Sequence, residues 1–132
     1  MNGTPALRID TTSTTPIYRQ IVDGIRSQLV EGRLGPGDAL PTVRDLALEL
    51  GIHFNTVAEA YRLLSAEGWL DLRRRRGAIV MARDTPEAPP AARQIFAEKL
   101  RQMIAQVRAE GLTRHTVADE LDALSAELRG EN

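Results

Sequence analysis

The chain contains no cysteine and no long apolar run, and each absence excludes a class of protein. Without cysteine there is no disulfide scaffold, no thiolate-bound zinc and no thiol nucleophile. No apolar segment approaches the ~20 residues that a membrane-spanning helix needs. The N-terminus also lacks the pattern of a secretory signal, so we expect a cytoplasmic protein. The net charge of −1 argues against nonspecific coating of nucleic acid.

Catalytic and metal-binding patterns are equally scarce. The two histidines, His53 and His115, lie in separate segments, and the carboxylates do not cluster at the spacing of metal ligands. The glycines of Gly35-Pro36-Gly37 lack the strand, helix and lysine that make a phosphate-binding loop. We therefore expect no enzyme, no metal site and no cofactor.

The hydrophobic pattern of the central stretch predicts a helix-turn-helix. Apolar residues recur at helical spacing in residues 43–50, and again in about residues 56–66. Thr42 and Asn55 are the expected N-caps of the two helices, and Gly51 suits the left-handed residue that ends the first. Helices joined this tightly cross at a steep angle, and the second of them can enter the major groove of DNA.

One helix is expected before this unit and a β-hairpin after it. Thr15 and Pro16 mark the start of an amphipathic helix to about Glu31, in which Gly24 indicates close approach by a neighbouring helix. Residues 69–72 and 78–81 have the pattern of short strands. A hairpin in this place is the wing of a winged helix-turn-helix, so the predicted fold is mainly α with a small β-hairpin.

A proline-rich linker at 85–92 divides a predicted DNA-binding domain, residues 1–84, from a two-helix tail, residues 93–132. Two helices of ~17 residues cannot enclose a core of their own, so the first domain or a second copy of the chain must cover their apolar stripes. We favour a second copy, because the stripes have the alternating spacing of helix-to-helix packing. The predicted dimerisation residues are Phe96, Leu100, Met103, Val107, Val117, Leu121, Leu124 and Leu128.

Several blocks of the sequence resemble, in order and spacing, the DNA-binding domain of GntR-family transcriptional regulators. The resemblance covers about residues 7–82, and the short tail is similar to the YtrA subfamily, which lacks the large ligand-binding domain of most of the family. It implies a homodimeric, usually repressing, transcription factor on a palindromic operator. The matching blocks include Pro16-Ile17-Tyr18-Arg19-Gln20-Ile21, Gly32-Arg33-Leu34-Gly35-Pro36-Gly37-Asp38, Leu40-Pro41-Thr42-Val43-Arg44-Asp45-Leu46-Ala47, Asn55-Thr56-Val57, Ala60-Tyr61-Arg62-Leu63-Leu64 and Glu67-Gly68.

The resemblance assigns DNA contacts to the helix-turn-helix. Arg44 matches a family arginine that contacts the DNA backbone or a base. Ala58 is a departure, because it stands where the family often has a basic residue, and one direct contact is therefore expected to be missing. Four consecutive residues fall where the family has its turn and recognition-helix contacts: His53, Phe54, Asn55 and Thr56.

The wing and the exposed side of the recognition helix supply the other predicted contacts. Because alternate residues of a strand face opposite sides, two of the four arginines at 73–76 should reach phosphates or the minor groove, and we predict Arg74 and Arg76. Arg62, on the exposed side of the recognition helix, is predicted to contact the DNA backbone. Family wings commonly read Arg-Gly-x-Gly, but here Arg75 replaces the first glycine, which leaves Gly77 for the left-handed turn position.

Two other functions fit the pattern less well. One is a winged-helix protein-interaction module that never meets DNA, but the arginine-rich wing and the polar recognition helix argue against it. The other is a metabolite sensor with its effector between the tail helices, which offer few polar groups to orient a ligand. We predict a sequence-specific, double-stranded-DNA-binding transcriptional regulator, expected to repress as a homodimer, with no membrane association and an unknown small-molecule effector.

Overall fold

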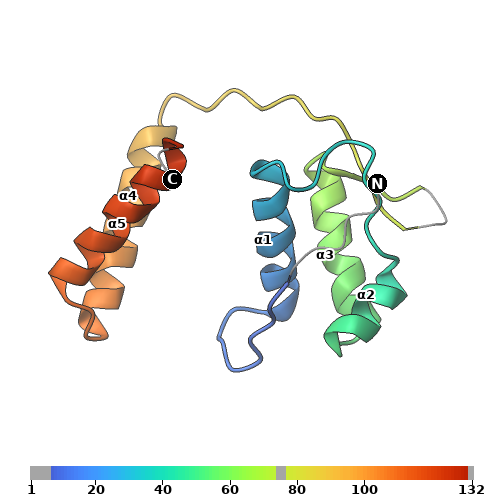
Figure 1. Ribbon diagram of the computed structural model, residues 1–132, viewed down its shortest axis with the longest axis horizontal. Helices are drawn as coiled ribbons and strands as arrows, with labels where there is room; N and C mark the ends of the chain where they lie inside the picture. The colour runs from blue at the N-terminus through green and yellow to red at the C-terminus, as the bar shows by residue number, and fades with distance from the viewer. Residues whose placement is uncertain (1–6, 74–76, 131–132) are drawn as a thin grey trace. The chain divides into compact units, whose positions relative to one another are not determined.

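The chain divides into two units, Met1–Thr85 and Pro86–Asn132 (Figure 1). The computed structural model describes residues 7–73 and 77–130. These elements confirm the predicted fold class, a winged helix-turn-helix with a two-helix tail. The first unit contains α1 (Ile17–Val30), α2 (Val43–Leu50), α3 (Phe54–Ala66), β1 (Leu70–Asp71) and β2 (Ile79–Val80), and the second contains α4 (Ala92–Ala109) and α5 (Arg114–Leu128).

Helix α3 is the centre of the first unit, where it lies between α1 and α2 and packs against both (Figure 1). One face of α3 carries four buried residues, Val57, Ala60, Tyr61 and Leu64, at the spacing of an amphipathic helix. They join buried residues of α1 and α2, such as Ile21, Ile25 and Leu46, in one hydrophobic core. The opposite face of α3 is therefore free for contact with a partner.

The sheet extends beyond the predicted hairpin, because a third segment pairs with β2. Strands β1 and β2 are antiparallel, with Leu70 opposite Val80 and Asp71 opposite Ile79. On the other side of β2, the Leu40 N–H donates to the carbonyl oxygen of Ala78 at 2.8 Å. The Val80 N–H donates to the carbonyl oxygen of Asp38, also at 2.8 Å. The chain that leads into α2 is thus bonded to the wing along its backbone.

The ends of α2 confirm the sequence prediction, whereas the predicted cap of α3 is wrong. Thr42 caps α2 by accepting a hydrogen bond from the Asp45 N–H at 3.1 Å, and Gly51 ends it with φ +68°. The N-cap of α3 is His53, whose Nδ1 accepts from the Asn55 N–H at 3.1 Å. Asn55 therefore lies inside the first turn, with its own side chain free of the capping role.

The start of α1 also differs from the prediction. Its N-cap is Pro16, with no side-chain hydrogen bond, so Thr15 does not cap the helix. Gly24 is closely approached by Leu7, from the segment before the helix, and not by another helix. A Cβ atom at Gly24 would lie 2.4 Å from Cδ2 of Leu7. The glycine therefore provides space for the arm that precedes α1.

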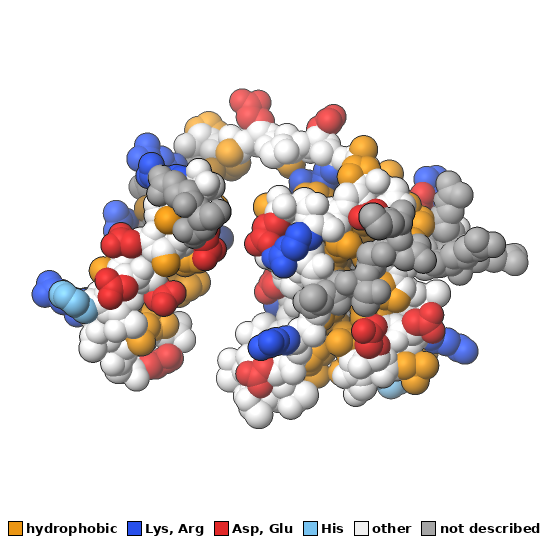
Figure 2. Space-filling view, in the orientation of Figure 1, with side chains coloured by type: hydrophobic (Ala, Val, Ile, Leu, Met, Phe, Trp, Pro, Cys, Tyr) orange, Lys and Arg blue, Asp and Glu red, His pale blue; other side chains and the backbone are white. Residues whose placement is uncertain are grey.

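The two-helix unit buries little of its apolar surface. Thr113 caps α5 by accepting from the Thr116 N–H at 3.1 Å, as predicted. No residue of α4 is buried, and Phe96 and Met103 are 63% and 62% exposed. Figure 2 shows hydrophobic side chains uncovered on this unit, among acidic ones. Within the described ranges, no helix has the length and hydropathy to cross a membrane.

A polar cluster fixes the end of α3 to α1 and to the segment after the wing. Two bonds join the Arg26 guanidinium to the Glu67 carboxylate, at 3.1 and 2.5 Å. The Arg83 Nε donates to the carbonyl oxygen of Glu67 at 2.9 Å, and its guanidinium lies 4.3 Å from the centroid of the Trp69 ring. The Arg26 guanidinium holds the pKa of the Glu67 carboxyl below its usual value.

This lowered pKa predicts a pH-dependent effect of Glu67→Gln. A carboxyl whose pKa is lower in the folded state stabilises the fold above its unfolded pKa, and the stabilisation is lost as the pH falls through the folded pKa. At about pH 7 we expect the variant to lose up to about 1 kcal/mol of unfolding free energy, with the difference closing towards about pH 3. Urea titrations of the wild type and the variant at both pH values measure the difference in unfolding free energy.

The matched control is Glu49→Gln, an exposed carboxylate of α2 that forms no ion pair with any described residue. It should change the unfolding free energy little at either pH. A loss in Glu67→Gln that is equally large at both pH values would show that the ion pair is not its cause.

Candidate nucleic-acid interface

Three elements of the first unit meet at the N-terminus of α2. From α3, the Tyr61 hydroxyl donates to the carbonyl oxygen of Pro41 at 2.7 Å. Burial raises the pKa of the Tyr61 hydroxyl, and the nearby Glu49 carboxylate adds to the effect, so the hydroxyl keeps the proton that it donates. From the wing, Gly77 lies so close that a Cβ atom there would be 2.7 Å from the carbonyl oxygen of Leu40. The start of α2 is therefore held from two sides.

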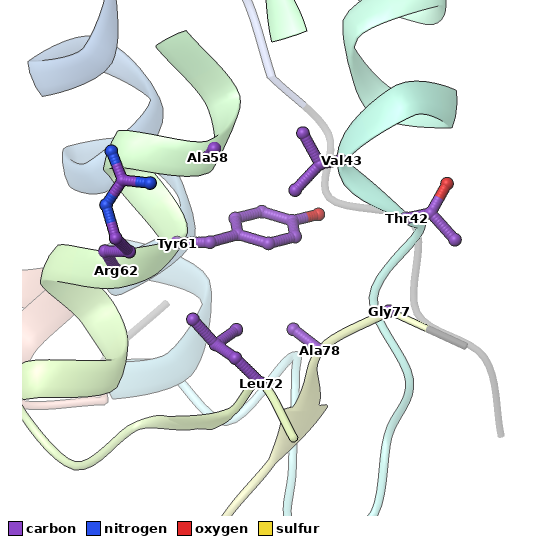
Figure 3. A pocket seen from close by; sticks show the side chains of 8 residues that line it. All are labelled: Thr42, Val43, Ala58, Tyr61, Arg62, Leu72, Gly77 and Ala78. Carbon is purple, nitrogen blue, oxygen red and sulfur yellow. The ribbon is translucent and has the colours of Figure 1, made fainter. Parts of the chain in front are cut away.

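A hollow of about 310 Å³ lies between these elements (Figure 3). In Figure 3 the Tyr61 ring extends from α3 toward the start of α2, with Val43 on one side of it and Leu72 and Ala78 of the wing on the other. On the α3 side of the hollow, Ala58 fills little space, because its side chain is a single methyl group. Among the described residues that line it, Arg62 is the only charged one; the others are Thr42, Val43, Ala58, Tyr61, Leu72, Gly77 and Ala78.

Two exposed arginines of α2 and α3 have no carboxylate partner among the described residues. Arg44 lies in the first turn of α2 and Arg62 on the exposed side of α3. Neither forms an ion pair with any residue in the described ranges. A free guanidinium in the first turn of a helix adds to the partial positive charge of that helix end, and the two together favour a phosphate. This part of the surface is suited to an anionic partner.

The predicted contact residues at the start of α3 lie together. The ring of the capping His53 stacks on Phe54, with 4.8 Å between centroids. Because its Nδ1 accepts the capping bond, the neutral His53 ring carries its proton on Nε2. Asn55 is exposed and Thr56 is half-buried. The recognition helix thus begins with four residues, of which three present exposed side chains.

The wing residues are only partly placed. Arg74 and Arg76 lie outside the described residues. Arg73 is paired with Asp71, whose carboxylate accepts from its Nε at 3.0 Å and from its Nη2 at 3.1 Å. Gly77 has φ +98°, the left-handed conformation expected of the one glycine left in the wing.

Sequence reasoning missed Glu59 as a residue of this surface. It is exposed, and it lies four residues after Asn55 and three before Arg62, so all three share one side of α3. That spacing was readable in the sequence. A carboxylate is repelled by phosphates but can accept a hydrogen bond from the amino group of cytosine. Within the described ranges, no three His, Asp or Glu residues are grouped to hold a metal ion.

The fold and this surface define a DNA-binding protein of the winged helix-turn-helix class. A family model described as bacterial regulatory proteins, gntR family, matches residues 17–80. The chain is 31% identical to the HTH-type transcriptional repressor YtrA of Bacillus subtilis (strain 168) over 124 residues, which span 94% of this chain and 95% of that protein.

Two solved structures agree with this match. YtrA from Sulfolobus acidocaldarius, a GntR-family transcription factor, is 32% identical with a TM-score of 0.55, over 93% of this chain and 99% of that one. A transcriptional antiterminator from Listeria monocytogenes EGD-e is 27% identical with a TM-score of 0.69, over 90% and 89% of the two chains. The chain belongs to the GntR family of transcriptional regulators, in its YtrA subfamily, and its helix-turn-helix is a DNA-binding domain.

Gly77→Ala should disturb the contact between the wing and α2. The new methyl group would meet the carbonyl oxygen of Leu40, and φ +98° is strained for any side chain. We expect a loss of about 1–3 kcal/mol in unfolding free energy, measured by urea titration. Gly35→Ala is the control, because Gly35 has ordinary φ and no atom within 4 Å of a new Cβ. Equal effects of the two substitutions would contradict the proposed role of Gly77.

Proposed function

We propose that this regulator is a homodimeric repressor that binds a palindromic operator through two copies of α3. The observation that supports it is the uncovered apolar surface of the two-helix unit. Phe96, Met103 and Leu124 are all more than half exposed, and Leu128 is 90% exposed. Contiguous exposed apolar side chains mark an interaction surface. A second copy of the chain presents the same surface, so a symmetric pair of hairpins would bury both.

The predicted dimerisation residues divide into two groups in the described chain. Val117 is buried within its own unit, and Leu100, Val107 and Leu121 are half-buried. Phe96, Met103, Leu124 and Leu128 remain exposed. In the proposed dimer the first group holds α4 against α5, and the second group contacts the partner chain.

Dimerisation explains how a small helix-turn-helix domain selects one DNA site. Two recognition helices related by a two-fold axis fit half-sites about 34 Å apart, one turn of DNA. A symmetric protein therefore selects a symmetric operator. The Bacillus relative carries the name of a repressor. We extend that action to this chain, which would occupy its operator in the cytoplasm and exclude other proteins from the site, without catalysing a reaction.

The proposed contacts fall into two kinds. Arg44, Arg62 and the wing arginines Arg74 and Arg76 contact phosphates or the minor groove, and these contacts supply most of the affinity. The start of α3 lies against base edges and supplies the sequence preference, through His53, Phe54, Asn55 and Thr56. Gly77 keeps the wing backbone close to α2 for these contacts.

Arg44→Ala should weaken binding to an operator selected from random DNA. Each dimer loses two phosphate contacts, so we expect about tenfold weaker binding and a salt dependence whose log–log slope falls by about two. Gel-shift titrations over a range of salt concentrations measure both.

The control for Arg44→Ala is Arg19→Ala, an exposed arginine on α1, on the other side of α3 from α2. It should leave the affinity and the slope unchanged. An unaltered slope in Arg44→Ala, with the fold intact by circular dichroism, would remove Arg44 from the interface.

Met103→Glu should convert the dimer to a monomer, because it places a charge in the proposed helix interface. We expect half the molecular mass in sedimentation equilibrium, and an affinity for the full operator that falls to that of a single half-site. Ala105→Glu adds the same charge about 200° around the same helix, at an exposed position, and should remain dimeric. A dimeric Met103→Glu would rule out this face of α4 as the interface.

A further inference from the structure

Phe54 is a large apolar side chain at an unexpected place, the first residue of the DNA-reading helix. It is 50% exposed and borders a second hollow, of about 440 Å³. Leu48, 82% exposed on α2, borders the same hollow. The described residues that line it are Arg44, Ala47, Leu48, Ile52, His53 and Phe54. This corner of the DNA-binding surface is therefore apolar, with one free guanidinium beside it.

The Phe54 ring packs against the residue that precedes it. It stacks on the His53 ring with an angle of 23° between the planes. The His53 ring is in turn fixed by the capping bond between its Nδ1 and the Asn55 N–H. The stacked ring stays half exposed, so it offers an apolar surface at the start of α3.

The chemistry of the major groove identifies the partner of such a surface. The base edges there present hydrogen-bond donors and acceptors, and the only apolar group among them is the 5-methyl group of thymine. A phenyl ring has no hydrogen-bonding group, so it cannot read the polar pattern. It can only prefer a methyl group over a base that lacks one.

We propose that Phe54 reads the 5-methyl group of a thymine in each operator half-site, with Leu48 lining the same hollow. The inference rests on the proposed function in one respect, since α3 must enter the major groove. The adjacent Arg44 favours DNA over an apolar protein segment as the occupant, because a protein segment would leave the unpaired guanidinium uncompensated.

The test removes the methyl group from the DNA and the ring from the protein in one double-mutant cycle. Thymines of the selected operator are replaced one at a time by deoxyuridine, which lacks only the 5-methyl group. At one thymine position in a half-site, deoxyuridine should weaken wild-type binding about fourfold, which is the loss of affinity expected when one methyl group is no longer buried. Phe54→Ala should bind more weakly than wild type and show no further loss at that position.

Two further variants separate this contact from general damage. Asn55→Ala removes a neighbouring polar side chain, so it should weaken binding yet keep the fourfold response to deoxyuridine. Phe54→Leu keeps an apolar side chain and should retain part of the response. Circular dichroism and thermal melts verify that each variant is folded.

The outcomes distinguish this inference from the proposed function. Wild-type protein that binds its operator but is indifferent to every deoxyuridine would overturn the inference alone. A folded Phe54→Ala variant that keeps the fourfold response would also overturn it. If the full-length protein selects no DNA site at all, both the inference and the proposed function fail.

Discussion

The hydrogen bond from the Tyr61 hydroxyl to the carbonyl oxygen of Pro41 is the contact on which the DNA-binding surface depends. It ties the core of α3 to the residues that lead into α2. Those residues are also bonded to the wing, through the Leu40 N–H and the carbonyl oxygen of Ala78. Because burial raises the pKa of the tyrosine hydroxyl, the donor is kept into alkaline solution. The recognition helix, the start of α2 and strand β2 are therefore joined by hydrogen bonds through the residues that lead into α2.

The two units differ in how much of their apolar surface they bury by themselves. The first encloses its own, around Val57, Leu64 and the buried face of α1. The second leaves side chains such as Met103 and Leu128 in solvent. In the proposed dimer, the stability of the tail depends on protein concentration, because association supplies the missing burial. DNA affinity would then be linked to the amount of repressor in the cell.

Periodicity and helix caps were enough to predict most of the fold. The bounds of α2 follow from its apolar spacing, from Thr42 and from Gly51. The cap of α3 was misassigned because Asn is a far commoner N-cap than His. Here the His53 ring reaches the Asn55 N–H, and that depends on where the turn ends. The pairing of residues 38–40 with β2 could not be predicted either, because a three-residue segment carries no alternating pattern and its partner lies about forty residues away.

The chemistry of the reading face was harder to foresee than its location. The sequence predicts which residues begin α3, but only the structure shows Phe54 stacked on His53 and exposed at the hollow that Leu48 also lines. With Ala58 in place of a basic residue and Glu59 on the exposed side, α3 itself carries little positive charge. In the proposed complex, attraction to DNA comes from Arg62 and from residues around the helix, such as Arg44, whereas discrimination comes from uncharged groups at the start of α3. Salt should consequently change the affinity by similar factors for operator variants that are bound with the same phosphate contacts.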